Sequence, residues 1–189
     1  EGYQVAVTGR RLDKLTALKK QYPASILVKQ NDIQDVADVE KVFNEIVAEF
    51  SSIDLVVQSS GVGYVNPKLE WEKQKQTINT NVLGCTRLYI LAYNLFKKQQ
   101  FGQLVGISSI ASLRGNRSAP DYFASKAYQK AYLESLYIKT KSIQSNTCKL
   151  DFTIKQAVAF YRSNSSTHML THILIKKLYF FIKPNQVTT

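Results

Sequence analysis

The sequence predicts an α/β domain built on a parallel sheet with helices on both faces. Short apolar runs alternate along the chain with longer amphipathic segments, which is typical of strands joined by helices. Hydrophobic residues make up 44% and charged residues 21% of the 189 residues. This balance favours one globular domain with a real core over a disordered chain.

The first half of the chain supplies two strands and two helices. Residues 4–8 and 25–29 are predicted strands, and a short helix between them carries Leu12, Leu15 and Leu18 on one face. Asp35 is the predicted N-cap of the second helix. The apolar stripe of this helix consists of Val36, Val39, Phe43, Ile46 and Phe50.

The second half continues the alternation. Asn81 and Gly84 fall near the middle of a long helical region, where we expect a local irregularity. The expected elements are, in order, a strand at 53–57, the helical region at 69–98, a strand at 104–107, a helix at 121–142 and a strand at 149–154. We assign residues 1–155 to one catalytic domain and residues 156–189, which show no clear period, to a divergent C-terminal tail.

Charge and cysteine content narrow the function classes. Residues 1–126 hold 16 Lys/Arg and 12 Asp/Glu, a balance of +4, whereas residues 127–189 hold 9 and 2, a balance of +7. The excess is spread over the last third, so a solvated basic surface is favoured over a nucleic-acid-binding module. Two cysteines, no secretory leader and no long apolar stretch favour a cytoplasmic protein without a transmembrane segment.

A tyrosine and a lysine lie four residues apart at the start of the predicted helix 121–142. The spacing of Tyr122 and Lys126 places both side chains on one helix face. A phenol is a poor proton donor at neutral pH, but a nearby ammonium stabilises the phenolate and makes a tyrosine useful as a general acid or base. Taken alone, the pair is better explained as two exposed helix residues.

Two further polar residues strengthen this interpretation. Ser109 follows the predicted strand 104–107 and lies thirteen residues before Tyr122, and Asn81 lies in the sequence Thr-Asn-Val-Leu-Gly. A serine hydroxyl at that place can orient a carbonyl oxygen beside the tyrosine. Together, Asn81, Ser109, Tyr122 and Lys126 resemble the Asn-Ser-Tyr-Lys tetrad of the short-chain dehydrogenase/reductase family.

The resemblance implies a Rossmann-type fold and a role for each residue. Tyr122 would be the general acid/base, and Ser109 would orient the substrate oxygen. Lys126 would stabilise the phenolate form of Tyr122 and bind the nicotinamide ribose. Asn81 would hold a water in a proton relay that reaches Lys126. The alternative is that these two residues have no part in a site. Asn81 would then be a hydrogen-bonded amide inside a helix, and Ser109 would be an ordinary hydroxyl in a loop.

Arginines follow the first strand at the place where this family carries an acidic residue when it binds NAD. Here Gly9 takes that place and Arg10 follows directly. A guanidinium attracts the 2′-phosphate of NADP, whereas a carboxylate would repel it. We therefore expect NADP(H) to be preferred over NAD(H), with Arg10 as the main contact and Arg11 as the second. The alternative is a pair of solvent-facing arginines.

Two other segments resemble cofactor-binding parts of the family. Asp32 and Ile33 follow the second strand, where Asp32 could accept a hydrogen bond from the adenine amino group or cap a turn. Gly61 ends the Gln-Ser-Ser-Gly segment that replaces the family's Asn-Asn-Ala-Gly, and these substitutions leave the support of the central strand uncertain. The nicotinamide end would be bound by Tyr122 and Lys126.

The chain departs from the family at both ends. A first strand and the Gly-rich turn that binds the pyrophosphate are not found before Glu1. Because that strand lies inside the sheet, we expect its absence to expose apolar surface. After residue 153 the family's Pro-Gly segment is replaced by Ile-Lys-Gln-Ala, consistent with either a divergent or a frame-shifted tail.

The tail contains two weaker signals. His168 and His172 lie one helical turn apart, but without a third ligand they are a poor zinc site. The apolar stretch 173–182 could contact a membrane surface or a partner, although a packed core edge is favoured.

As a whole, the resemblance implies hydride transfer between NADP(H) and a carbonyl or alcohol substrate. Related enzymes often associate through long helices, so it also implies a homo-oligomer. The alternative is a non-catalytic fragment or relic that kept the site residues without turnover.

Overall fold

A computed structural model describes residues 2–141, 149–157 and 179–184 of the chain. Its strands form one six-stranded sheet in the order β2-β1-β6-β3-β4-β5. The strands are β1 (Tyr3–Gly9), β2 (Ile26–Gln30), β3 (Leu55–Gln58), β4 (Phe101–Ser109), β5 (Lys149–Ala157) and β6 (Tyr179–Pro184). The helices are α1 (Leu12–Gln21), α2 (Val36–Phe50), α3 (Trp71–Ile78), α4 (Cys85–Gln99) and α5 (Pro120–Lys141).

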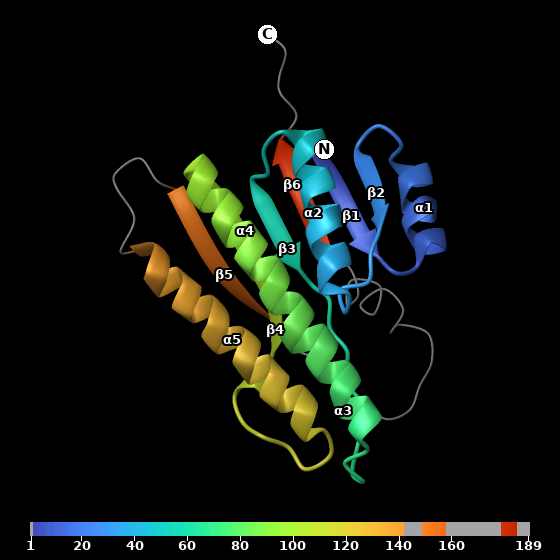
Figure 1. Cartoon of the computed structure of the whole chain (residues 1–189), viewed down its shortest axis with the longest axis vertical. Coiled ribbons are helices and arrows are strands. Elements are labelled where there is room, and N and C mark those ends of the chain that lie inside the picture. Colours follow the sequence, from blue (N-terminus) through green and yellow to red (C-terminus); the bar gives the residue numbers. More distant parts are fainter. Residues whose placement is uncertain (1, 142–148, 158–178, 185–189) are drawn as a thin grey trace.

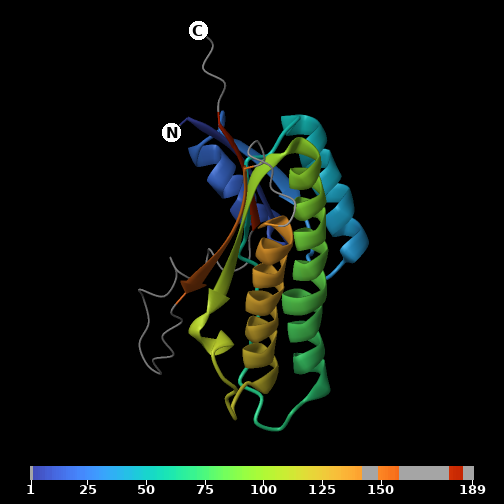
Figure 2. The ribbon, with the colours of Figure 1, turned by 90° about the vertical axis from the view of Figure 1, so that its left-hand side faces the viewer.

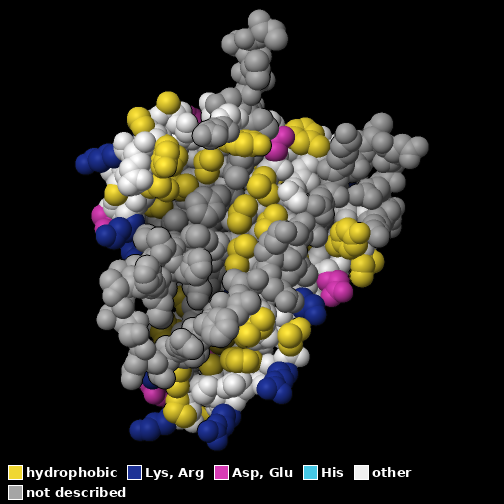
Figure 3. Space-filling view, turned by 180° about the vertical axis from the view of Figure 1, so that it is seen from behind, with side chains coloured by type: hydrophobic (Ala, Val, Ile, Leu, Met, Phe, Trp, Pro, Cys, Tyr) yellow, Lys and Arg dark blue, Asp and Glu magenta, His cyan; other side chains and the backbone are white. Residues whose placement is uncertain are grey.

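Helices cover both faces of the sheet, as the alternation predicts. Helices α2, α4 and α5 lie side by side on one face, and α1 lies on the other (Figures 1 and 2). The larger core lies between the sheet and the three helices, whereas Val7, Leu15 and Ile26 form a small cluster beneath α1. On the α1 face, hydrophobic side chains of the described residues remain in view along the sheet (Figure 3).

Most predicted elements are found close to their expected bounds. The predicted helix cap and most of the predicted apolar helix faces are also present. Asp35 caps α2, because its side chain accepts hydrogen bonds from the backbone N–H groups of Ala37 and Asp38. The stripe of α2 is buried except at Val36, which is 40% exposed in the first turn. In α1 the expected face is less complete: Leu15 is buried, but Leu12 is 45% exposed.

The irregularity expected near Asn81 and Gly84 is a π-helical turn over Asn79–Gly84 that joins α3 to α4. Gly84 is required there by close packing: a Cβ on it would lie 2.0 Å from the backbone oxygen of Ile33. The turn therefore brings the start of α4 against the loop between β2 and α2.

The interior position of the sheet between β1 and β3 is occupied by β6. Strand β6 pairs antiparallel with both neighbours, and Phe181 lies in register with Ala6 and Val56. All three residues are 0% exposed, and the Phe181 ring meets Phe43 edge-on with ring centroids 5.4 Å apart. The expectation that a missing strand would expose apolar surface at this position is therefore wrong, because a distant part of the chain fills it.

Strand β6 also resolves part of the apolar stretch 173–182. Its residues 179–182 form an interior strand rather than a membrane contact or an exposed partner surface. The pair His168 and His172 lies outside the described residues. None of the helices that the structure describes has the length and apolar character needed to span a bilayer.

Candidate functional site

The predicted site residues gather at one edge of the sheet. Strand β1 pairs in parallel with β2, and β3 pairs in parallel with β4. The carboxyl ends of these strands can therefore supply loops to a common site. In open α/β sheets, ligands bind in the crevice beyond these ends. The π-helical turn and the first turn of α5 supply the remaining polar residues.

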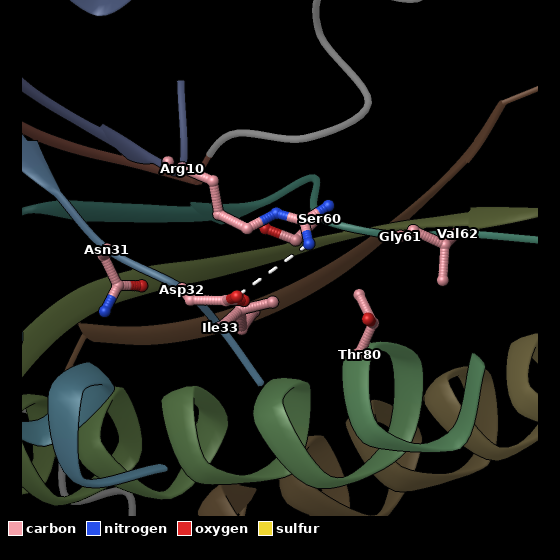
Figure 4. Close-up of a pocket in the computed structure, with 9 residues that line it drawn as sticks. Arg10, Asn31, Asp32, Ile33, Ser60, Gly61, Val62 and Thr80 are labelled. Carbon is pink, nitrogen blue, oxygen red and sulfur yellow. Dashed lines mark ion pairs between the residues drawn. The ribbon is translucent and has the colours of Figure 1, made fainter. Parts of the chain in front are cut away.

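A small hollow that is open to solvent lies at this edge (Figure 4). Four of the predicted cofactor residues line it, Arg10, Asp32, Ile33 and Gly61, whereas Arg11, Tyr122 and Lys126 do not. Arg11 is exposed at the N-cap of α1 and makes no side-chain capping bond. The other residues that line the hollow are Gly9, Asn31, Ser60, Val62 and Thr80.

Charged side chains meet across the mouth of this hollow. Arg10 and Asp32 form an ion pair of 3.8 Å, with side chains 47% and 43% exposed (Figure 4). Such an exposed pair is weak, so the guanidinium can exchange the carboxylate for another anion at little cost. Asp32 also caps a turn by accepting a hydrogen bond from the Gln34 N–H at 3.1 Å. The structure thus shows Asp32 in the turn-capping role, with one carboxylate oxygen facing Arg10.

Thr80 lines the hollow and carries an unpartnered hydroxyl. The residue is only 4% exposed, and its Oγ1 has no hydrogen-bond partner within the described residues. The side chain points from the π-helical turn toward Gly61 and Val62 (Figure 4). A buried polar atom ordinarily finds a partner, so a polar ligand in the hollow would satisfy it. No pattern in the sequence singles out Thr80, although this residue directly precedes Asn81 in the motif.

Asn81 holds the loop after β3 against the helices. Its side chain accepts from the Val62 N–H at 2.8 Å and donates to the Val62 oxygen at 2.7 Å and to Ser125 Oγ at 2.9 Å. These contacts satisfy the amide, so the structural role expected for a buried asparagine is present. A Cβ on Gly61 would lie 3.3 Å from Lys126 Nζ and 3.5 Å from Asn81 Oδ1. The loop therefore passes directly over both side chains.

Lys126 is buried beside Tyr122. Its Nζ donates to the Ile107 oxygen at 3.2 Å and to Gln129 Oε1 at 2.8 Å, and the residue is 5% exposed. The same Nζ lies 5.9 Å from the centre of the Tyr122 ring. The half-buried ring packs on Gly63, where a Cβ would lie 2.4 Å from Tyr122 Cδ2. The ammonium and the phenol ring thus share one helix face, as the spacing predicts.

Ser109 ends β4 and is 2% exposed. Its Oγ accepts from the Ala111 N–H at 3.2 Å and caps the short 3-10 helix Ile110–Ser112. This is the loop-hydroxyl role that the sequence left as an alternative. Helix α5 packs against the 3-10 helix, so Ser109 and the first turn of α5 border the same region.

A buried polar network supports the central strand. Gln58 Nε2 donates to the Ser60 oxygen at 2.6 Å and to Cys85 Sγ at 2.8 Å, and its Oε1 accepts from Tyr89 at 2.8 Å. Burial raises the pKa of the Cys85 thiol to about 12 and raises the pKa of Tyr89 well above its usual value. Gln58 therefore supports the end of β3, because its side chain bonds to the loop that follows this strand and to two residues of α4.

The residues fit one half of a dinucleotide. The exposed Arg10 guanidinium and the Thr80 hydroxyl, which has no partner among the described residues, suit the anionic and polar groups at the adenosine end of such a cofactor. The pyrophosphate half does not fit in the same way. In the doubly wound strand order 3-2-1-4-5-6, strand 1 carries the Gly-rich turn, and its position corresponds to the place between β1 and β3. That place holds antiparallel β6.

Comparison with known proteins places the chain in a family. The model for the short chain dehydrogenase family matches residues 1–151. The chain is 33% identical over 142 residues to an uncharacterized oxidoreductase of Myxococcus xanthus, covering 72% of this chain and 56% of that protein. It is 28% identical over 127 residues to a 3-oxoacyl-[acyl-carrier-protein] reductase of Bos taurus, covering 66% of this chain and 54% of that protein.

Solved structures show the same fold. An alcohol dehydrogenase from the archaeon Thermococcus sibiricus, complexed with 5-hydroxy-NADP, superposes with a TM-score of 0.71 at 22% identity. The superposition covers 89% of this chain and 72% of that one. The chain spans just over half the length of the curated relatives it matches, 56% in the case of the Myxococcus protein. The match over residues 1–151 shows that this chain belongs to the short-chain dehydrogenase family.

Proposed function

We propose that the protein is an NADP(H)-dependent oxidoreductase that acts on a carbonyl or alcohol group. One observation carries the proposal: the buried Lys126 ammonium lies 5.9 Å from the Tyr122 ring, beneath the loop at Gly61 that borders the hollow. This arrangement brings a general acid/base candidate next to a ligand site. Family membership supports the reaction class.

Each residue of the tetrad would have a separate role. In the reducing direction, Tyr122 donates its phenolic proton to the substrate oxygen while the adjacent ammonium stabilises the phenolate that forms. Ser109 would orient the same oxygen from the end of β4. Asn81 would keep the loop at Val62 in place through its paired hydrogen bonds. When bound, the nicotinamide supplies or accepts the hydride.

Preference for NADP(H) is supported by Arg10. Among the described residues, its exposed guanidinium at the hollow pairs with the partly exposed carboxylate of Asp32. A phosphate dianion carries more charge than a carboxylate and forms bidentate bonds with arginine. Arg11 lies outside the hollow, so Arg10 is proposed as the main contact and Arg11 as a minor one.

A cofactor titration tests the proposal. The chain is titrated with NADPH while cofactor fluorescence is followed, and NADPH oxidation is then measured with a panel of carbonyl compounds. Saturable binding with carbonyl-dependent oxidation supports the enzyme. Absence of both in this chain and in a longer form that includes an upstream Gly-rich turn would refute it.

The Tyr122→Phe variant tests the acid/base assignment. We expect it to abolish turnover, because it removes only the phenolic oxygen, and to leave NADPH affinity nearly unchanged. The rate of NADPH oxidation and the fluorescence titration measure the two effects. A Tyr122→Phe protein with full activity would show that another group moves the proton.

A non-catalytic role is the second candidate, and β6 favours it. Antiparallel β6 occupies the interior position between β1 and β3, where the doubly wound fold places its nucleotide-binding first strand. A chain in this form would bind the adenosine half of a nucleotide at the hollow without turnover. Binding of 2′-phospho-ADP-ribose without any carbonyl-dependent NADPH oxidation is the result that distinguishes it.

The low cysteine content supports a location in the reducing cytoplasm, and the family resemblance supports a homo-oligomer. Sedimentation of the purified chain at several concentrations measures its assembly state. Fluorescence microscopy of the tagged full-length protein measures its location.

A further inference from the structure

A glutamine on α5 contacts three residues around the proposed site. Gln129 is 1% exposed and lies three residues after Lys126. Its Oε1 accepts from Lys126 Nζ at 2.8 Å. Its Nε2 donates to the backbone oxygen of Asn81 at 2.8 Å and to Cys85 Sγ at 3.2 Å. The amide is therefore satisfied at both ends by groups of the site.

We propose that Gln129 is a positioning residue, which fixes the Lys126 ammonium and bridges it directly to the Asn81 carbonyl. The bridge runs from Nζ to Oε1 and from Nε2 to the Asn81 oxygen, with all three residues at most 5% exposed. Family resemblance assigns a water to the link between Lys126 and Asn81. In this chain the amide of Gln129 also links the two groups through its own atoms.

The chemistry of an amide differs from that of a water in this place. A water can accept one proton and release another, whereas a primary amide accepts at its oxygen and donates at its nitrogen without passing a proton on. Gln129 therefore holds the ammonium in one orientation and moves no proton.

The π-helical turn makes this bridge geometrically available. Asn81 lies in the middle of that turn, and its carbonyl oxygen faces α5 closely enough to accept from Gln129. The second ammonium bond, to the Ile107 oxygen, comes from β4. Lys126 is thus anchored from two sides, by β4 and through Gln129 by the π-helical turn. A charged group held at two acceptors loses little freedom when a ligand arrives.

The test reads the Lys126 ammonium directly, without cofactor or substrate. The full chain is labelled with ¹⁵N-lysine, and the Lys126 side-chain signal is assigned by its loss in Lys126→Arg. The exchange rate of its ammonium protons with water is then measured in wild type, Gln129→Leu, Gln129→Glu and Leu133→Met. Leu133 is a matched control, because it is 1% exposed on the same helix and packs on Gly106 instead.

We expect Gln129→Leu to raise the exchange rate roughly tenfold, because one charged hydrogen bond is lost. Gln129→Glu keeps an oxygen acceptor for Nζ and should restore slow exchange, while Leu133→Met should match wild type. Equal exchange in folded Gln129→Leu and wild type would overturn the bridge, as would an equal rise in Leu133→Met. If Gln129→Leu does not fold, Gln129→Asn is measured in its place. Its shorter side chain should raise the exchange rate of the Lys126 ammonium protons. A rate equal to that of wild type would overturn the proposal.

The proposal rests on the proposed function only for the importance of Lys126. Because the signal is read in the free chain, an absence of turnover would leave the exchange result standing. Conversely, a refuted bridge would leave the assignment of Tyr122 untouched.

Discussion

Close packing around single residues sets the geometry of the site. Gly63 has no side chain, and the Tyr122 ring occupies the space where its Cβ would lie. Gly61 similarly allows the loop to pass over Lys126 and Asn81. The placement of the phenol therefore depends on a residue that carries no functional group.

The Gly63→Ala variant should displace Tyr122. A Cβ would lie 2.4 Å from Tyr122 Cδ2, so the ring must move, and a shift of about 1 Å near the reacting group costs roughly a hundredfold in rate. The rate of NADPH oxidation measures the effect. Gly115→Ala is the control, since no atom of the described residues lies within 4 Å of a Cβ there. Equal rates in both variants would show that Tyr122 does not need its present position.

Cys85 should be unreactive in the folded chain. Burial raises the pKa of its thiol to about 12, and only the thiolate is a nucleophile. At pH 8 we expect alkylation by iodoacetamide to be more than about a hundredfold slower than in urea, because each pKa unit above the pH lowers the thiolate fraction tenfold. The measurement uses Cys148→Ser, so that mass spectrometry follows Cys85 alone. Rapid native alkylation would contradict the buried network around Gln58.

At the scale of elements, charged side-chain pairs join α2 to a neighbouring helix and to a strand beneath it. Arg87 of α4 bonds to Glu40 of α2, and Lys29 of β2 bonds to Glu45 of α2 at 2.7 Å. The second pair lies over the strand whose end supplies Asp32 and Ile33 to the hollow. It therefore helps to hold the ligand-binding loop at the sheet edge.

The Lys29–Glu45 pair should make stability depend on pH in the acid range. The hydrogen bond and charge of Lys29 lower the pKa of Glu45 in the folded chain. Its stabilising effect is then fully present above the unfolded pKa, about 4.3, and is lost as the pH falls through the lower folded pKa. The difference in urea midpoint between wild type and Glu45→Gln should therefore be present at pH 7 and vanish in acid.

Glu49→Gln controls for removing a charge from the same exposed side of α2. A midpoint difference for Glu45→Gln that persists unchanged to low pH would show that the carboxylate charge is not its cause.

At the scale of the whole molecule, β6 joins the two halves of the sheet. One half contains β2 and β1, and the other contains β3, β4 and β5. Phe181 contacts Phe43 of α2 and lies between Ala6 and Val56 in the strand register. The small side chain of Ala6 leaves room beside β6 for this ring. Cohesion of the sheet thus depends on a segment far from its neighbours in the sequence.

The Phe181→Ala variant should strongly destabilise the fold. Removing a fully buried phenylalanine lowers the free energy of unfolding by about 3–5 kcal/mol, which urea denaturation measures. Phe101→Ala is a matched control, because that ring is 37% exposed at the start of β4, and we expect a loss within about 1 kcal/mol. Similar losses in the two variants would argue against an interior position for β6.

The sequence by itself determined the local elements and the identity of the family. The alternation of strands and helices, the Asp35 cap and the irregular turn at Asn81 are set by contacts between near neighbours, which a periodic pattern records. The shared face of Tyr122 and Lys126 follows from helix spacing alone.

The tertiary structure alone decided which distant residues meet. Strand β6 pairs antiparallel with its neighbours in the sheet. Cys85 of α4 accepts hydrogen bonds from Gln58 of β3 and from Gln129 of α5. A buried amide shows no period and no motif in the sequence, because its partners are backbone oxygens and a thiol up to 48 residues away. The physical reason is that local propensity specifies strands and helices, whereas sheet order and polar networks depend on packing in the folded chain.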